Sequence, residues 1–513
     1  MFKGNSVLGI SLVLSILFVF IGVIFNNWLD QKASAFLDFA VTYFNWFYLL
    51  IGAAFVFICL YLMFSKYGNI RLGKDTDKPA HSTFSWITML FSAGMGVGMV
   101  FWGVAEPVAH YTTPPFGEGS TGESASAAIK YTFFHWGLHP WALYGIVALG
   151  LAYFHFRKDL PSSMSSIFHP LLGDKINGPI GKTIDVLSVF ITAVGVASTF
   201  GLSSLQISSG MNSQWGIPDT LTVQLLIIAI GFILFIISSW SGLNRGIKYL
   251  SNFNMLLLVL LTLSVLMIGP TKQIFEMLIS STGSYVGSIV PMSLRMEPFD
   301  NEANNWIGAW TVFYWAWWTT WAPFVGSFIA RISKGRTIKE FILCALLVPS
   351  LISFVWFSVM GGSAIHFIHD LGNSALAENI NADVNGALFE FLSNIPLGSV
   401  LSIIALILIF SFFITSADSA TFVLGMLSSN GDLDPSNKIK ITWGIIIAGS
   451  ATVFLSAGGL DAVKTISIVA ASPFSIILIF ISWSILKALK KEYNAEITQM
   501  NTNHREKTKE KTL

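Results

Sequence analysis

The sequence predicts an all-α polytopic membrane protein of about twelve transmembrane helices. Of its 513 residues, 53% are hydrophobic and only 11% are charged, and this charged share is roughly half that of a soluble domain. Apolar runs long enough to cross a bilayer, about 20 residues each, recur from end to end. The Lys and Arg residues gather in alternate loops, which is typical of helices that cross a membrane in succession.

Twelve apolar segments are candidate membrane spans. They lie near residues 7–25, 45–64, 84–109, 127–154, 183–211, 220–240, 250–269, 306–330, 338–360, 397–426, 440–457 and 463–486. The first is too long for the core of a signal peptide and is expected to remain as helix one. Only the last residues look solvated, so we expect one transmembrane domain over 1–486 and a charged cytoplasmic tail over 487–513.

The basic residues orient these helices. Of the 29 Lys and Arg residues, nearly all lie in the tail, before helix one, or in alternate loops such as the one that follows residue 64. The exceptions are Lys32, Lys130, Lys272, Arg295 and Lys464. Because loops rich in Lys and Arg stay in the cytoplasm, both termini are expected on the cytoplasmic side.

Composition also argues against other classes of protein. A net charge of +1 gives no reason to expect nucleic acid. Cys59 and Cys344 fall inside predicted helices and are interpreted as packed thiols. His135 and His139 are four residues apart but have no third ligand nearby in the sequence, so we predict neither a metal site, nor a cofactor, nor an enzyme. An ion channel is disfavoured because no filter sequence repeats.

Glycines interrupt the predicted helix three. Gly94, Gly96 and Gly98 stand at every second position, a spacing that does not serve one helix face. Two interpretations are open. The glycines could let a neighbouring helix pack closely, or they could mark a broken helix whose freed backbone groups bind substrate and ion near the middle of the membrane.

Aromatic residues are concentrated in helices four and eight. Helix four carries Trp136, Trp141 and Tyr144, which could line a cavity or belong to an interfacial belt. Helix eight carries five tryptophans within residues 310–321, and these descend through many depths whereas a belt occupies one. A quaternary ammonium has no N–H group to donate, but each aromatic face attracts it by about 0.5–2 kcal/mol. The pattern therefore predicts a quaternary-ammonium site.

Helix ten presents hydroxyl groups. Thr415 and Ser416 follow Phe412 by three and four residues and share its helix face. Such hydroxyls often bond back to the preceding turn, but together with a backbone carbonyl they are also hard oxygen ligands suited to sodium. The motif Phe413-Ile-Thr415 echoes Phe190-Ile-Thr192 in helix five, which is weak support for an inverted repeat.

At these residues the sequence resembles the betaine/choline/carnitine transporter family, and the resemblance covers nearly the whole chain. The aromatic run of helix eight, the glycine run of helix three and the segment 328–336 carry it, and the likeness is greatest to glycine betaine transporters of Gram-positive bacteria. The resemblance implies a bacterial inner-membrane protein with a leucine-transporter-like core. Two extra helices would precede two inverted five-helix repeats, at about 84–269 and 306–486, and the family often forms homotrimers.

The resemblance also implies site residues. It places the ammonium cage on Trp136, Trp141, Tyr144 and Trp318, with Trp321 nearby. It assigns one sodium ion to backbone oxygens of Ser92, Met95 and Phe412 and to the hydroxyls of Thr415 and Ser416.

A second sodium site in the family would use Thr192 and Phe324 together with a hydroxyl at the position of Val196. The valine at this position removes that ligand.

Taken together, the aromatic residues and the resemblance lead us to expect import of a quaternary-ammonium osmolyte, glycine betaine, by cation symport with sodium favoured. Gly98 suits a zwitterion, because choline-directed relatives tend to carry an acid there. A proton-coupled choline or carnitine transporter is the alternative.

Overall fold

A computed structural model describes residues 6–94, 96–240 and 244–510 of the chain. Over these residues the protein is helical and contains no β-strand, and the only extended pairing is an isolated bridge between Arg71 and Thr337. The prediction of an all-α protein is confirmed. Within the described residues, ten helical stretches are long and apolar enough to cross a membrane, and one of them, Gly122–Arg157, is made of two successive helices and a π-helical turn.

The helices follow the predicted segments with some shifts. Those of the first half are α1 (Ser6–Ile24), α2 (Asn26–Phe64), α3 (Thr83–Gly94), α4 (Val97–Thr112), α5 (Gly122–Trp136), α6 (Leu138–Ala152), α7 (His169–Leu172), α8 (Pro179–Trp215), α9 (Leu221–Trp240) and α10 (Asn244–Ile268). Those of the second half are α11 (Thr271–Ser293), α12 (Asn301–Ile307), α13 (Phe313–Ile332), α14 (Ile338–His369), α15 (Ser374–Ala382), α16 (Ala387–Ser393), α17 (Gly398–Ser428), α18 (Asn437–Ser456) and α19 (Leu460–Glu510).

Three predicted segments are divided in the structure. The segment 84–109 is split into α3 and α4, and the segment 127–154 into α5 and α6. The segment 306–330 begins in α12, passes through a π-helical turn at Gly308–Val312 and continues as α13. The glycine run had offered the first division as one of two interpretations. Hydropathy gives the extent of an apolar run but not the continuity of its backbone, so the other two divisions were not predicted.

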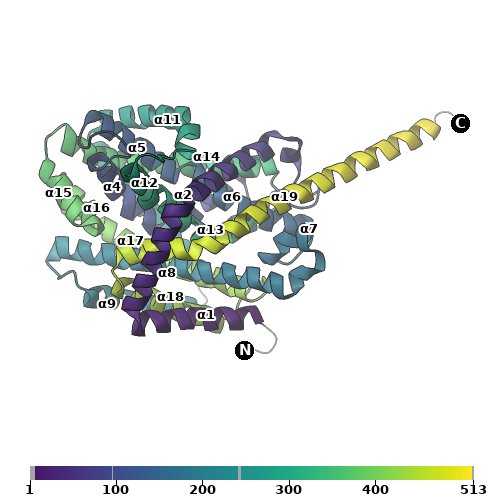
Figure 1. Ribbon diagram of the computed structural model, residues 1–513, viewed down its shortest axis with the longest axis horizontal. Helices are drawn as coiled ribbons and strands as arrows, with labels where there is room; N and C mark the ends of the chain where they lie inside the picture. Colours follow the sequence, from purple (N-terminus) through teal and green to yellow (C-terminus); the bar gives the residue numbers. More distant parts are fainter. Residues whose placement is uncertain (1–5, 95, 241–243, 511–513) are drawn as a thin grey trace.

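Two helices extend well beyond their apolar segments. Helix α2 begins at Asn26 rather than near residue 45, and α19 continues to Glu510 rather than ending near residue 486. Polar residues such as Gln, Lys and Glu favour helix as much as apolar ones do, so helices run on past the hydrophobic stretch. Figure 1 shows the C-terminal part of α19 projecting away from the bundle as a single rod.

The central helices pack as pairs that are far apart in sequence. Helix α6 packs along α13, α8 along α17, and α4 against α14. Helix α11 packs against α5 and α14 and lies at the top of Figure 1. Tyr285 on α11 is buried whereas Ile279 and Val286 are exposed, which suits an amphipathic helix on the surface of the bundle.

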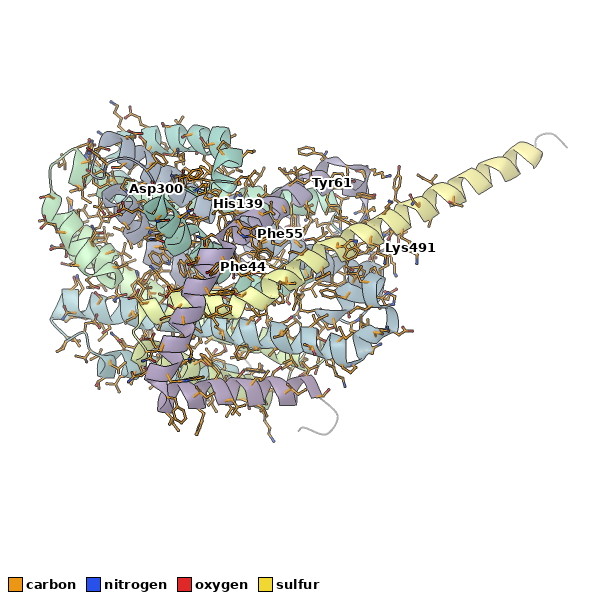
Figure 2. The ribbon with its side chains drawn as sticks, viewed as in Figure 1. Phe44, Phe55, Tyr61, His139, Asp300 and Lys491 are labelled. Carbon is orange, nitrogen blue, oxygen red and sulfur yellow. The ribbon has the colours of Figure 1, made fainter. Side chains whose placement is uncertain are left out.

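The outer surface is apolar along α2. Phe44 and Tyr61 are exposed by 39% and 46%, whereas Phe55 on the same helix is only 2% exposed, and Figure 2 shows all three on α2. Lys491 marks the part of α19 that leaves the bundle. A long exposed apolar face of this kind suits contact with lipid.

Candidate functional site

The glycine run forms a break in the helix. Helix α3 ends at Gly94 and α4 begins at Val97, with Gly96 in an extended conformation at φ −151° and ψ −155° between them. A Cβ atom added to Gly96 would meet nothing within 4 Å, whereas one added to Gly98 would come within 2.5 Å of Cη2 of Trp317. The helix break is therefore present, and Gly98 also allows close packing of a neighbouring helix. That the freed backbone groups bind substrate and ion stays a prediction.

A cavity of about 630 Å³ adjoins this break. Its wall includes residues of the break and residues of α17, namely Gly96, Val97, Gly98, Phe412, Thr415 and Ser416. The volume lies within the range of small-molecule binding sites, about 300–1,000 Å³. The cavity reaches the surface beside the segment that precedes α3, because the exposed residues His81, Phe84 and Ser85 also line it.

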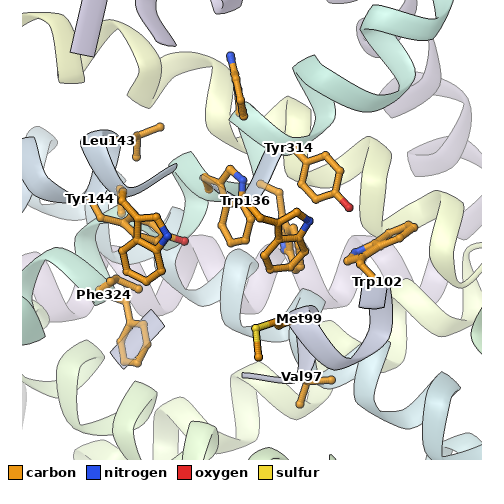
Figure 3. Packing of buried hydrophobic residues seen from close by; sticks show 14 of the residues in the cluster. Val97, Met99, Trp102, Trp136, Leu143, Tyr144, Tyr314 and Phe324 are labelled. Carbon is orange, nitrogen blue, oxygen red and sulfur yellow. The ribbon is translucent and has the colours of Figure 1, made fainter. Parts of the chain in front are cut away.

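Aromatic rings form the inner end of the cavity. Trp136 of α5, Tyr144 of α6 and Trp318 of α13 line it together with Trp317 and Trp321. The ring centroids of Trp136 and Trp318 lie 4.8 Å apart with planes at 83°, and those of Tyr144 and Trp318 lie 6.0 Å apart at 87°. Figure 3 shows Trp136 amid this group, with Tyr144 and Phe324 to one side. Such perpendicular rings present several faces to one space.

Trp141 does not join this wall. Its ring packs against Tyr144 at 5.7 Å, and it is not among the residues that line the described cavity. The expectation that Trp136, Trp141 and Tyr144 lie along one continuous helix is wrong, because the chain breaks between α5 and α6 at Gly137.

The break at Gly137 is tightly filled. A Cβ atom there would come within 2.5 Å of the Phe133 carbonyl oxygen and 2.9 Å of Oη of Tyr285. The freed N–H of Leu138 donates to that same Tyr285 oxygen at 3.1 Å. Tyr285 of the surface helix α11 thus caps the N-terminus of α6, which begins two residues after Trp136.

The hydroxyl groups predicted for sodium face the same cavity. Oγ1 of Thr415 lies 3.1 Å from the carbonyl oxygens of both Ser411 and Phe412, and it accepts a hydrogen bond from Nδ2 of Asn254 at 3.1 Å. Ser416 lines the cavity beside it. Of the remaining proposed ligands, Ser92 lies within α3 and Met95 is outside the described residues.

The residues expected for a second sodium ion are not brought together at the cavity. Phe324 lines it, but Thr192 is not among the described lining residues and its hydroxyl donates to the Ser188 carbonyl at 2.7 Å. Val196 is only 1% exposed. The hydroxyl residue of α8 that does line the cavity is Thr199, two turns beyond Thr192.

Several residues at the site were missed by sequence reasoning. Trp317, Thr199 and Asn254 line the cavity, and Glu106 is completely buried beside it. Periodicity could not single out Thr199 or Asn254 among many polar residues. Glu106 did carry a signal, because an acidic residue within an apolar segment is a functional candidate by default.

Glu106 also changes the interpretation of His135. The sequence offered no third ligand for a metal near His135 and His139, but the structure places Glu106 and His110 at His135, with ligand atoms within 4.8 Å of one another. These atoms already bind each other, since Oε1 of Glu106 lies 2.7 Å from Nδ1 of His135 and 3.2 Å from Nε2 of His110. His139 instead contacts Oγ of Ser293 at 2.8 Å.

Comparison with known proteins identifies the family. Residues 6–494 match the family described as BCCT, betaine/carnitine/choline family transporter. The chain belongs to this family. It is similar to the glycine betaine transporter OpuD of Bacillus subtilis, with 49% identity over 95% of both chains. A probable glycine betaine transporter of Desulfitobacterium hafniense is 42% identical over 96% of this chain and 98% of its own.

A further relative has a different printed substrate. The ectoine/hydroxyectoine transporter of Virgibacillus pantothenticus is 42% identical over 95% of this chain and 97% of its own. Membership of the betaine/carnitine/choline family makes the protein a multi-pass membrane transporter of a small molecule and not an enzyme.

Proposed function

We propose that this transporter imports glycine betaine in symport with sodium, as an osmolyte carrier of the bacterial inner membrane. The observation that carries the proposal is the aromatic end of the cavity, where Trp136, Tyr144 and Trp318 meet as neighbouring rings. Aromatic faces attract a trimethylammonium group that offers no hydrogen-bond donor. Trp321 and Trp317 extend the same aromatic wall.

The carboxylate of the substrate binds, in this proposal, at the break between α3 and α4. The N-terminus of α4 begins at Val97 and lines the cavity together with Gly96 and Gly98. The first N–H groups of a helix have no partner within the helix, and the helix dipole favours a negative charge there. A zwitterion with its cation among the rings and its carboxylate toward α4 uses both features, and choline has no carboxylate to place.

Sodium is the coupling ion in this proposal. Thr415 and Ser416 supply two hydroxyl oxygens, and backbone oxygens of Ser92, Met95 and Phe412 complete the set. Support comes from the position of Phe412, Thr415 and Ser416 on the wall of the same cavity as the break. The pair Thr192 and Phe324 is a weaker second candidate, because Thr192 is not among the described residues that line the cavity.

The cavity opens to the cytoplasm in this proposal. Its surface end lies beside His81 and Ser85, which follow the basic loop that carries Lys66, Arg71 and Lys74. Basic loops stay in the cytoplasm, so the conformation is inward-facing. The proposal includes twelve spans in all, with α3–α4 as span three, α12–α13 as span eight, and inverted repeats at about 84–269 and 306–486.

Uptake into proteoliposomes tests the function. Radiolabelled glycine betaine is expected to accumulate when sodium is outside and to equilibrate without accumulation when sodium is replaced by potassium. Accumulation driven by a pH gradient alone would make the protein proton-coupled and refute the sodium assignment. Unlabelled betaine, choline, carnitine, ectoine and proline are then added as competitors. If ectoine competes more strongly than betaine, the substrate is ectoine, as in the name of the Virgibacillus relative.

The homotrimer stays a prediction. The mass of the detergent-solubilised protein, measured by light scattering with the detergent contribution subtracted, checks it directly.

A further inference from the structure

The carboxylate of Glu106 is completely buried between three helices. Its Oε2 accepts hydrogen bonds from Nε1 of Trp136 at 2.7 Å and from the hydroxyl of Tyr314 at 2.5 Å. Its Oε1 lies 2.7 Å from Nδ1 of His135 and 3.2 Å from Nε2 of His110. A carboxylate offers about four lone-pair sites. Trp136 and Tyr314 donate to two of them, and hydrogen bonds donated to a carboxylate stabilise its charged form.

Glu106 therefore ties together elements on both sides of the cavity. The acid lies on α4, beyond the helix break; Trp136 ends α5; and Tyr314 lies on α13, one turn before Trp318. The rings of Trp136 and Tyr314 pack at 5.7 Å, and Figure 3 shows the two side chains next to each other.

The hydrogen bond between Glu106 and Trp136 affects the ring face that Trp136 presents to the cavity. The Trp136 ring packs against Trp318 at 4.8 Å and lines the cavity, while its N–H points away to Glu106. A hydrogen bond from an indole N–H to a carboxylate is charge-assisted and shifts electron density into the ring. Because the attraction of a cation to an aromatic ring is electrostatic, a richer ring and a negative charge behind it both strengthen that attraction.

The neighbouring positive charge is set apart from this acid. Nζ of Lys464 on α19 lies 5.0 Å from the ring centroid of Trp310 and 5.3 Å from that of Trp102. Among the described residues no direct ion pair joins Lys464 to Glu106. The other titratable groups in contact with the carboxylate are His110, His135 and Tyr314.

We propose that Glu106 is a positioning residue of the substrate site that acts through Trp136. It fixes the orientation of the ring and supplies the negative charge behind it, and so favours a substrate with a cationic head over an uncharged molecule of the same shape. The inference rests on the proposed function, in which the Trp136 ring contacts a trimethylammonium group.

The test separates charge from shape. Glu106→Gln keeps the size of the side chain, and its amide oxygen can still accept from Trp136 and Tyr314 while its NH₂ donates to the histidine rings, each of which has an acceptor in one tautomer. Two probes are compared in proteoliposomes. One is glycine betaine, and the other is tert-butylacetate, its carbon isostere, in which a neutral tert-butyl group replaces trimethylammonium.

We expect the KM for glycine betaine to rise roughly tenfold in Glu106→Gln. The inhibition constant of tert-butylacetate should stay the same or fall, since its head carries no charge. The preference for betaine over the isostere then drops by about the same factor. Equal weakening of both probes, or an unchanged preference, would overturn the inference, because loss of cage shape alone affects both molecules.

Lys464→Met gives a test of opposite sign in a protein that retains Glu106. Methionine keeps an apolar chain of similar length against Trp102 and Trp310, but the opposing positive charge is gone. The preference for betaine should increase; a decrease contradicts the inference even if Glu106→Gln does not fold.

Asp185→Asn is the matched control. Asp185 is another buried carboxylate, on α8, and it accepts hydrogen bonds from the backbone N–H and the hydroxyl of Ser165 at 2.8 and 2.7 Å. Removal of its charge should leave the preference unchanged, and a change equal to that of Glu106→Gln would overturn the inference. If the unmodified protein takes up no betaine, the proposed function fails; if it does and the preference never moves, only the role of Glu106 fails.

Discussion

Two helix breaks belong to the site region, and they differ in what surrounds them. The break between α3 and α4 borders the cavity, and a Cβ atom on Gly96 would meet open space. The break between α5 and α6 is filled, since a Cβ atom on Gly137 would collide with Phe133 and Tyr285. Tyr285 also accepts the freed N–H of Leu138.

This difference separates a binding break from a supporting one. Freed backbone groups in a membrane protein must find partners in protein, in water or in a ligand. At the Gly137 break the partner is the hydroxyl of Tyr285, so this break fixes the position of Trp136 relative to Tyr144. At Gly96 the break borders the cavity instead, and the Gly96 carbonyl accepts a hydrogen bond from the N–H of Met99 at 3.2 Å. Variants at the open break should therefore fail mainly in transport, and variants at the filled break mainly in stability.

The largest expected effect on betaine uptake comes from a change of Trp318, whose ring contacts both Trp136 and Tyr144. Trp318→Leu keeps apolar volume but removes an aromatic face, and loss of roughly 1–2 kcal/mol of attraction should raise the KM for betaine about tenfold or more. Uptake kinetics in proteoliposomes measure this change.

Trp315→Leu is the matched control for that variant. Trp315 lies one turn earlier on α13, its ring stacks on His139 at 5.0 Å and 10°, and it does not line the main cavity as described. We expect less folded protein but the same KM. An unchanged KM in Trp318→Leu would remove that ring from the cage.

The next effect concerns the ion at the open break. The double variant Thr415→Ala, Ser416→Ala removes two oxygens, and an ion left with backbone ligands alone cannot replace its hydration. The half-saturating sodium concentration should rise about tenfold, equivalent to about 1.4 kcal/mol, while the KM for betaine at saturating sodium changes little. Initial uptake rates measured over a sodium series give both values.

A double variant with normal sodium dependence would show that sodium, if it binds, binds elsewhere. Ser411→Ala is a useful comparison. Ser411 lies one turn before Thr415 on α17 and donates to Asn254 of α10, but it is not among the residues described as lining the cavity.

The third prediction compares the two glycines directly. Gly137→Ala forces a methyl group against the Phe133 carbonyl and Tyr285, and overpacking of this kind costs about 1–3 kcal/mol. Gly96→Ala places its methyl group in open space at a φ of −151°, which any residue adopts, so its stability should change little. Thermal unfolding of the detergent-solubilised proteins ranks the two, and equal losses would contradict the distinction between the breaks.

The sequence predicted the chemistry of the site better than its backbone. Aromatic and hydroxyl residues at Trp136, Tyr144, Trp318, Thr415 and Ser416 were identified, and the structure places all five on one cavity wall. Helical spacing grouped Thr415 and Ser416 on one face, and aromatic residue type singled out Trp136 and Tyr144. The choice of Trp318 among five tryptophans came from the resemblance to the family. Their roles in binding remain predictions.

What the sequence could not supply depends on contacts between distant segments. Trp141 belongs to the aromatic motif but is not among the described residues that line the cavity. The break at Gly137, which separates it from Trp136, is filled by Tyr285 of α11, a contact between distant segments. Thr199 lines the cavity whereas Thr192 is not among the described lining residues. Which turn of α8 faces inward depends on how that helix packs against its neighbours, and a hydropathy pattern does not contain that packing.

The smallest effect tests the cap itself. Tyr285→Phe removes one oxygen and leaves the buried N–H of Leu138 without its partner, which costs about 1–3 kcal/mol and should lower the thermal unfolding temperature. Tyr48→Phe is the matched control, because the Tyr48 hydroxyl pairs with Oγ of Ser472 at 2.7 Å and that serine also bonds the Ile468 carbonyl. Its loss leaves no orphaned backbone group, so the control should lose less stability. Since Leu138 stands between Trp136 and Tyr144, a loosened cap should also raise the KM for betaine a few-fold in Tyr285→Phe alone. If Tyr48→Phe raises it equally, the Gly137 break is not what holds the rings in place.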